Sequence, residues 1–166
     1  VTRLDLQTKI YTVGRVNAAL HFNDDITKFV ELKTQNDYVY WDVEIANQKA
    51  SFTKDTLSFS INKGEVFSYK ESEITLHDSL YLQDQTLIIE RYPLNDAVAE
   101  VRNNLTATAA SKQGEIINLN FTGVNIARNE AVLNTVMQVM QDDQVEDKRL
   151  ISKVSLAFIN DRLDGL

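Results

Sequence analysis

The chain has 166 residues, 43% of them hydrophobic and 25% charged, with a net charge of −7 and no cysteine. This size and mixture predict one folded domain with a hydrophobic core and exclude a disordered chain. The acidic balance argues against nucleic acid and anionic lipid as partners, and the missing cysteines exclude disulfides, thiol catalysis and thiolate metal sites.

The two ends of the sequence suggest a piece of a longer protein. The chain begins with Val1 rather than Met, shows no signal-peptide pattern, and stops at Leu166 within a helical pattern. Its apolar runs stay well below the roughly 18 residues that cross a membrane. We therefore expect any membrane segments of the parent protein to lie outside this chain.

The first half of the chain is predicted to form strands. Apolar and polar residues alternate with a period of two, or strand-forming residues cluster, in five stretches. These stretches are 2–7, 38–43, 56–61, 74–77 and 87–89. Alternation indicates one buried face and one wet face. Five short strands at this spacing favour an antiparallel sandwich or a curled sheet.

The pattern changes at Pro93, the only proline, which suits the first turn of a helix predicted to run to Leu105. A turn is expected at 111–114 and a strand at 115–122. Asn125 is a good helix N-cap, and the helical pattern from there reaches Leu163. One helix of roughly 55 Å is favoured. Two helices joined by a charged loop remain the alternative.

These elements predict an α+β fold in which two segments form one domain. Residues 1–91 form its β-rich segment, an antiparallel sandwich or curled sheet. Residues 92–166 form the helix–strand–long helix segment packed with it.

The last helix carries two apolar stripes separated by the polar stretch 142–149, which we expect to be exposed because burying unpaired charges is costly. The first stripe is Leu133, Val136, Met137 and Met140. It is predicted to be buried against the strand that carries Ile117, Leu119 and Phe121, so that Met137→Asp would unfold the domain.

The second stripe consists of Ile151, Val154 and Phe158. It has no obvious partner within the chain. We expect it to pack against another helix or a neighbouring subunit, as an otherwise exposed apolar patch would.

The residues predict no catalytic centre, cofactor or metal site. The five glycines are scattered singly, so a phosphate-binding loop is absent from the sequence. His21 and His77 lie far apart and are interpreted as ordinary strand or turn residues, with a ligand role for either left open. The acidic pairs at 24–25 and 142–143 lack calcium-loop spacing and are interpreted as solvated.

Aromatic residues concentrate around Trp41, together with Tyr38, Tyr40, Phe52 and Phe59. Aromatic residues in alternating strands usually form core or cross-strand pairs. The alternative is a sugar-binding platform made of Tyr38, Tyr40 and Trp41 in a carbohydrate-binding β-sandwich. The exposure of Trp41 discriminates between the two.

A succession of short motifs covers residues 80–163. The strand at 87–92 reads LIIERY and leads into the helix at Pro93, and the strand at 114–123 reads GEIINLNFTG. The segments AVLNTV at 131–136 and SLAFINDRL at 155–163 follow. In this order and spacing the motifs resemble the periplasmic region of the Wzz/Wzc superfamily of chain-length determinants. The opening RLDL at 3–6 is similar to a stretch of the Wzc-like branch.

The resemblance implies a bacterial inner-membrane polysaccharide co-polymerase, with this chain on the periplasmic face between two transmembrane helices. Such proteins form rings, often octamers, and regulate chain length or export of capsular polysaccharide or exopolysaccharide. The implied partners are further copies of the protein, the polymerase and export machinery, and the nascent polysaccharide. In the Wzc-like branch a cytoplasmic tyrosine autokinase follows, so kinase activity would lie outside this chain, which we expect not to be an enzyme.

Overall fold

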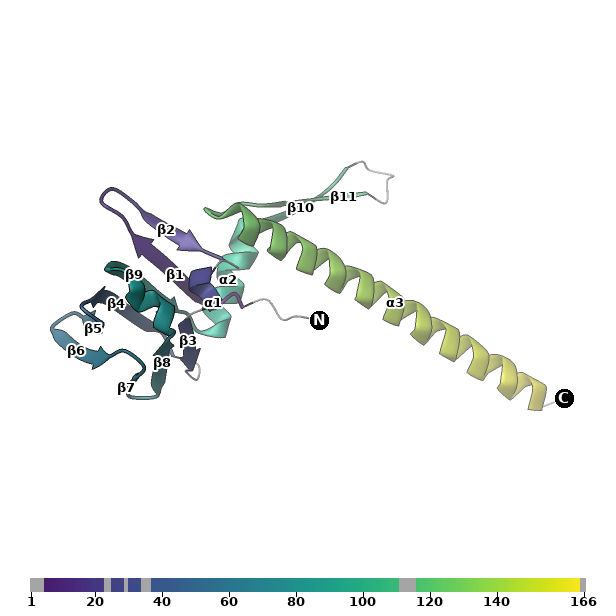
Figure 1. The fold of residues 1–166 in the computed structure, drawn as a ribbon. Coiled ribbons are helices and arrows are strands. Elements are labelled where there is room, and N and C mark those ends of the chain that lie inside the picture. Colours follow the sequence, from purple (N-terminus) through teal and green to yellow (C-terminus); the bar gives the residue numbers. More distant parts are fainter. Residues whose placement is uncertain (1–4, 23–24, 29, 34–36, 111–115, 165–166) are drawn as a thin grey trace.

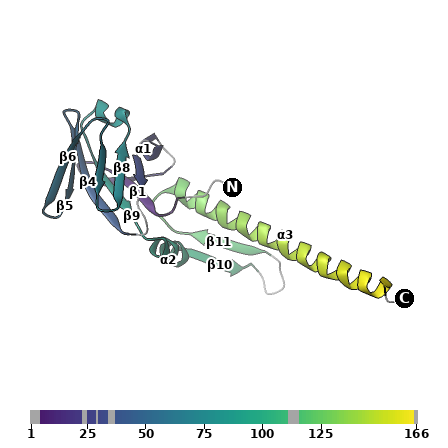
Figure 2. The same ribbon diagram turned by 90° about the horizontal axis from the view of Figure 1, so that it is seen from below.

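The computed structural model describes residues 5–22, 25–28, 30–33, 37–110 and 116–164 (Figure 1). It has the predicted α+β class, with antiparallel sheets in the first half and one long helix at the end. Figures 1 and 2 show that this helix projects away from the sheets of the first half.

The larger sheet has six strands in the order β2-β1-β9-β4-β5-β6, and every neighbouring pair is antiparallel. Its strands are β1 (Thr8–Val13), β2 (Ala18–His21), β4 (Val39–Ala46), β5 (Lys49–Lys54), β6 (Leu57–Asn62) and β9 (Gln85–Arg91). Strand β9 lies between β1 and β4, so it joins the start of the chain to the central hairpin.

The smaller sheet has three strands in the order β3-β8-β7. They are β3 (Val30–Lys33), β7 (Val66–Tyr69) and β8 (Ser72–Leu76), and two short helices, α1 (Asp25–Lys28) and η1 (Asp78–Leu82), accompany them. Side chains from both sheets form one buried cluster, in which Phe52 of the larger sheet stacks on Phe67 of the smaller at 4.0 Å between ring centroids. The predicted sandwich is therefore the observed one.

Strand β4 illustrates why this core forms. Val39, Trp41, Val43 and Ile45 are buried, and the residues between them face outward. A strand with period-two alternation can bury only one of its faces against a second sheet.

The second half contains helix α2 (Leu94–Asn104), the two-stranded ribbon of β10 (Leu105–Ala109) and β11 (Ile117–Phe121), and helix α3 (Ile126–Asp164). Helix α3 is continuous over 39 residues, which confirms the single-helix prediction. Asn125 caps it as predicted, since its side-chain oxygen accepts a hydrogen bond from the Arg128 backbone N–H at 2.9 Å.

Two local predictions were wrong. The strand expected over 2–7 begins only at Thr8, because the Asp5 carboxylate accepts hydrogen bonds from the backbone N–H groups of Gln7 and Thr8 and holds a turn there. The helix expected to reach Leu105 ends one residue earlier, because Leu105 pairs with Phe121 and starts β10. Residues 2–4 and the turn expected at 111–114 lie outside the described residues.

Candidate functional site

The second half of α3 exposes an unusual amount of apolar surface. Ile151, Val154 and Phe158 are 65%, 62% and 61% exposed, as expected for a stripe without a partner in the chain. Val145, Leu150, Leu156 and Ile159 are exposed as well. We call residues 145–159 the distal segment. Large contiguous apolar patches on a protein surface mark interaction sites.

The exposed apolar residues lie on two nearly opposite faces of the distal segment. At about 100° per residue, Ile151, Val154 and Phe158 share one face. The same geometry places Val145, Leu156 and Ile159 on a face roughly half a turn away. The sequence prediction found only the first face. The second face was also recognisable in the sequence, because apolar residues spaced by 11 and 3 positions fall on one side of a helix. A helix that is apolar on both sides is suited to burial between two neighbours.

The stretch 142–149 is exposed, as predicted. Glu146 and Arg149 form a pair at 3.5 Å on the same helix face, with both side chains largely in solvent. Such a pair contributes little to stability. These charges keep the part of α3 between the first and second apolar stripes exposed to solvent.

The first stripe of α3 is less buried than predicted. Leu133, Met137 and Met140 face Ile117 and Leu119 of the ribbon across an open groove of about 590 Å³. Met137 is 44% exposed, so its predicted burial is wrong, and a charge there is no longer expected to unfold the domain. A ribbon of two strands is too narrow to cover a helix stripe.

Burial in this region is confined to the point where the ribbon meets the start of α3. Phe121 and Val132 are buried there. Further along, Ile117 at the other end of β11 is itself exposed. Among the described residues, the buried apolar packing of α3 therefore lies in its first turns.

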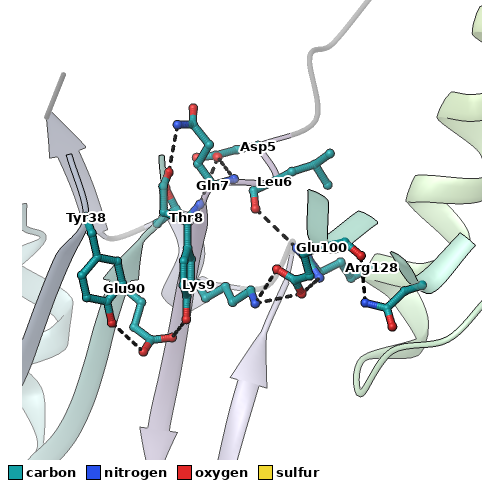
Figure 3. A network of polar contacts seen from close by, with 11 residues as sticks. Asp5, Leu6, Gln7, Thr8, Lys9, Tyr38, Glu90, Glu100 and Arg128 are labelled. Atoms are coloured by element: carbon teal, nitrogen blue, oxygen red, sulfur yellow. Dashed lines mark hydrogen bonds and ion pairs between the residues drawn. The ribbon is translucent and has the colours of Figure 1, made fainter. Parts of the chain in front are cut away.

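A polar network fixes the base of α3 to the sandwich (Figure 3). The Glu100 carboxylate of α2 lies 2.8 Å from Lys9 Nζ and 3.6 Å from Arg128 Nη1. Arg128 is buried and also donates to the Leu6 carbonyl at 3.4 Å. The Asn125 amide donates to the Leu20 carbonyl at 3.0 Å. Four separate parts of the chain thus set the direction in which α3 projects.

The aromatic cluster divides between the two faces of the larger sheet. Trp41 is 2% exposed and packs edge-on against Phe67 at 4.8 Å and Phe52 at 6.3 Å. A sugar platform that includes Trp41 is therefore wrong, because its ring is enclosed between the sheets. Tyr38 and Tyr40 do not join this core, and Tyr38 is 46% exposed.

Tyrosines and carboxylates are linked on the outward face of the larger sheet. The Tyr40 hydroxyl donates to Asp42 at 2.9 Å, and the hydroxyls of Tyr92 and Tyr38 donate to Glu90 at 3.0 and 3.4 Å. Burial raises the pKa of Tyr40 to about 12, with Asp42 adding to the rise. Burial and Glu90 likewise raise the pKa of Tyr92 and Tyr38. These hydroxyls remain protonated donors at physiological pH.

The two histidines have local hydrogen bonds. His21 Nε2 lies 2.7 Å from Thr12 Oγ1 in the β1–β2 hairpin. His77 Nδ1 accepts from the Ser79 backbone N–H at 3.2 Å at the start of η1. Asp142 and Asp143 are exposed on α3, whereas the side chains of the other acidic pair lie outside the description. In the described part of the chain, three or more His, Asp or Glu side chains nowhere gather closely enough to hold a metal ion.

The sequence matches no family model, and no match is found among curated proteins. Among the described residues, no helix combines the length and apolar character needed to cross a membrane. In the described part of the chain, the distal segment exposes apolar side chains, and the outward face of the larger sheet carries hydrogen-bonded tyrosines.

Proposed function

We propose that this chain is the periplasmic assembly domain of an inner-membrane polysaccharide co-polymerase, and that it acts by bringing copies of the protein together rather than by catalysis. The observation that carries the proposal is the distal segment of α3. Its two apolar faces are exposed, and the buried residues of α3 in the described part of the chain lie near its N-terminal end.

The distal segment is suited to protein neighbours. Lys148, Arg149 and Lys153 lie among its apolar residues, so the helix is too charged for a lipid core. Apolar residues at spacings of three and four are the pattern by which helices pack side by side. A helix with two such faces can contact one neighbour on each side, which is what a closed ring of identical subunits requires.

The resemblance noted above supplies the class of protein. Its motifs fall on β9, α2, β11 and two stretches of α3, one in its first turns and one near its end. In this proposal the sandwich is the base and α3 is the assembly arm. Any kinase activity of the parent lies in a part outside this chain.

The test compares charged substitutions on α3 in the full-length membrane protein. Phe158→Asp and Ile159→Asp each put a carboxylate on one apolar face, whereas Ser155→Asp adds the same charge at an exposed polar position. We expect the first two to reduce oligomer size on native gels and to alter polysaccharide length profiles, and Ser155→Asp to leave both unchanged. Wild-type oligomers and chain lengths in both Phe158→Asp and Ile159→Asp would refute the assembly role.

The isolated chain provides two further checks. We expect it to be monomeric or weakly associated at micromolar concentration, because membrane tethering is what raises the effective concentration of neighbours in the parent. Sedimentation velocity measures this, and a stable octamer of the isolated chain would contradict it. Incubation with ATP and magnesium should yield no phosphotyrosine, although six tyrosines are available.

A further inference from the structure

The outward face of the larger sheet carries a cluster that the assembly role does not use. We call it the tyrosine–carboxylate face. Its members are Tyr11, Tyr38, Tyr40, Asp42, Glu90 and Tyr92. Trp41 of β4 and Ile89 of β9 are buried in the core. Their neighbours Tyr40 and Glu90 stand opposite each other across the two strands. Because side chains alternate along a strand, Tyr40 and Glu90 lie on the face turned away from the core.

The rings of this face are partly accessible and held in place. Tyr38 and Tyr92 lie 5.2 Å apart at an interplanar angle of 51°, so they form a corner. Both hydroxyls donate to the same carboxylate, Glu90, which restricts their rotation. Figure 3 shows Tyr38 beside Glu90. A ring that is already ordered loses little conformational entropy when a ligand stacks on it.

The polar groups of the face are mainly acceptors. The hydroxyls of Tyr40 and Tyr92 donate their hydrogens to Asp42 and Glu90. What these hydroxyls and carboxylates can still offer a ligand is therefore lone pairs, which accept hydrogen bonds. The matching ligand must offer hydrogen-bond donors. It must also offer apolar surface to the rings, and it must lack negative charge, because the carboxylates repel anions.

A neutral sugar meets these three conditions. Its hydroxyls donate to carboxylates, and the C–H faces of its ring are apolar and stack on aromatic side chains. A basic peptide is less suited, because the face already has its own cation. Lys9 Nζ lies 4.8 Å above the Tyr92 ring and 2.8 Å from Glu100.

Hydroxyl side chains extend the face toward the edge of the sheet. Asp42 stands beside Thr53 of β5, which stands beside Ser58 of β6. Ser51 and Ser60 form a parallel row, with their hydroxyls 3.1 Å apart. From β9 to β6 there are three strand spacings, roughly 14 Å in all. This length accommodates several sugar units, and an open surface admits the middle of a chain.

We propose that the tyrosine–carboxylate face binds a neutral oligosaccharide chain, with Tyr38 stacking on a sugar ring and Asp42 and Glu90 accepting its hydroxyls. This inference goes beyond the assembly role, which depends on α3. Either proposal can fail without the other, and Phe158→Asp is expected to leave sugar binding unchanged.

The test is titration of the chain with the neutral hexasaccharides maltohexaose, cellohexaose and laminarihexaose, followed by calorimetry and NMR. We expect at least one to bind, with shifts centred on β4 and β9. Tyr38→Ala and the isosteric Asp42→Asn should each weaken binding about tenfold, as loss of one stacking or charged contact implies. Glu73→Gln, on the exposed face of the smaller sheet, is the matched control and should bind as the wild type does. Thermal melts establish that each variant is folded.

Three outcomes would overturn the inference. The first is that none of the hexasaccharides binds. The second is binding that Tyr38→Ala and Asp42→Asn leave unchanged. The third is binding of oligolysine at the same residues without binding of any hexasaccharide, which would assign the face to a basic protein partner.

Discussion

Replacing Phe52 with alanine removes a side chain that lies entirely inside the sandwich. Phe52 has no exposed surface, stacks on Phe67 at 4.0 Å and lies edge-on to Trp41 at 6.3 Å. Truncation of a buried phenylalanine costs about 3–5 kcal/mol. At about 2–4 °C per kcal/mol for a domain of this size, Phe52→Ala should lower the Tm by roughly 6–20 °C.

Phe158→Ala is the matched control, because it makes the same chemical change at a side chain that is 61% exposed. Its effect on the free energy of unfolding should stay within about 0.5 kcal/mol, as for other exposed positions. Trp41 is the only tryptophan and lies in the core, so its fluorescence reports unfolding of the sandwich in both variants.

Equal losses of stability in the two variants would contradict the exposure of Phe158, since the distal segment would then be folded back onto the core. A cost below about 1 kcal/mol for Phe52→Ala would contradict the burial of Phe52, because that value is too small for a cavity at a fully buried site. A red-shifted Trp41 emission in the native protein would contradict the enclosed position of its ring.

Four more substitutions test what burial and charge contribute to stability. Met137→Asp should cost less than about 1 kcal/mol because the groove is open. Val132→Asp, five residues nearer the base at a buried site, should unfold the chain. Denaturant titration separates the two outcomes. Arg128→Met should lower the free energy of unfolding by about 1–3 kcal/mol in the same assay. This is less than the cost of breaking a typical buried ion pair, because Glu100 keeps Lys9 as a partner. An unchanged unfolding midpoint would show that the network does not stabilise the fold. The raised pKa of Tyr40 means that its protonated form is favoured by folding, so this stabilisation is complete below pH 10 and lost as the pH rises through about 12. Between pH 10 and about 12, Tyr40→Phe should therefore lose less stability than the wild type does. Thermal melts and tyrosinate absorbance measure this. Equal losses in the two proteins would contradict the raised pKa of Tyr40.

Features that depend on neighbouring residues in the chain were predictable from the sequence. The cap at Asn125 and the uninterrupted run after it predicted a helix to Leu163, and α3 ends one residue later at Asp164. The alternation at 38–43 and 56–61 predicted β4 and β6. Capping and periodicity act within a few residues, so the information is local. The exposure of the second stripe followed for the same reason, because three apolar residues shared a face and had no complementary segment nearby.

Features that depend on contacts between distant segments were decided only by the tertiary structure. Both faces of 38–43 carry aromatic residues, and the period of two could not tell which face the second sheet would cover. Strand β10 forms because Leu105 finds Phe121, and Arg128 matters because α2 and residue 6 meet it. Met137 has the spacing of a core residue, yet it remains half exposed because the ribbon facing it has two strands rather than a full sheet. Burial is a property of whatever packs on a side chain, and that partner can lie anywhere in the chain or, for the distal segment, in another molecule.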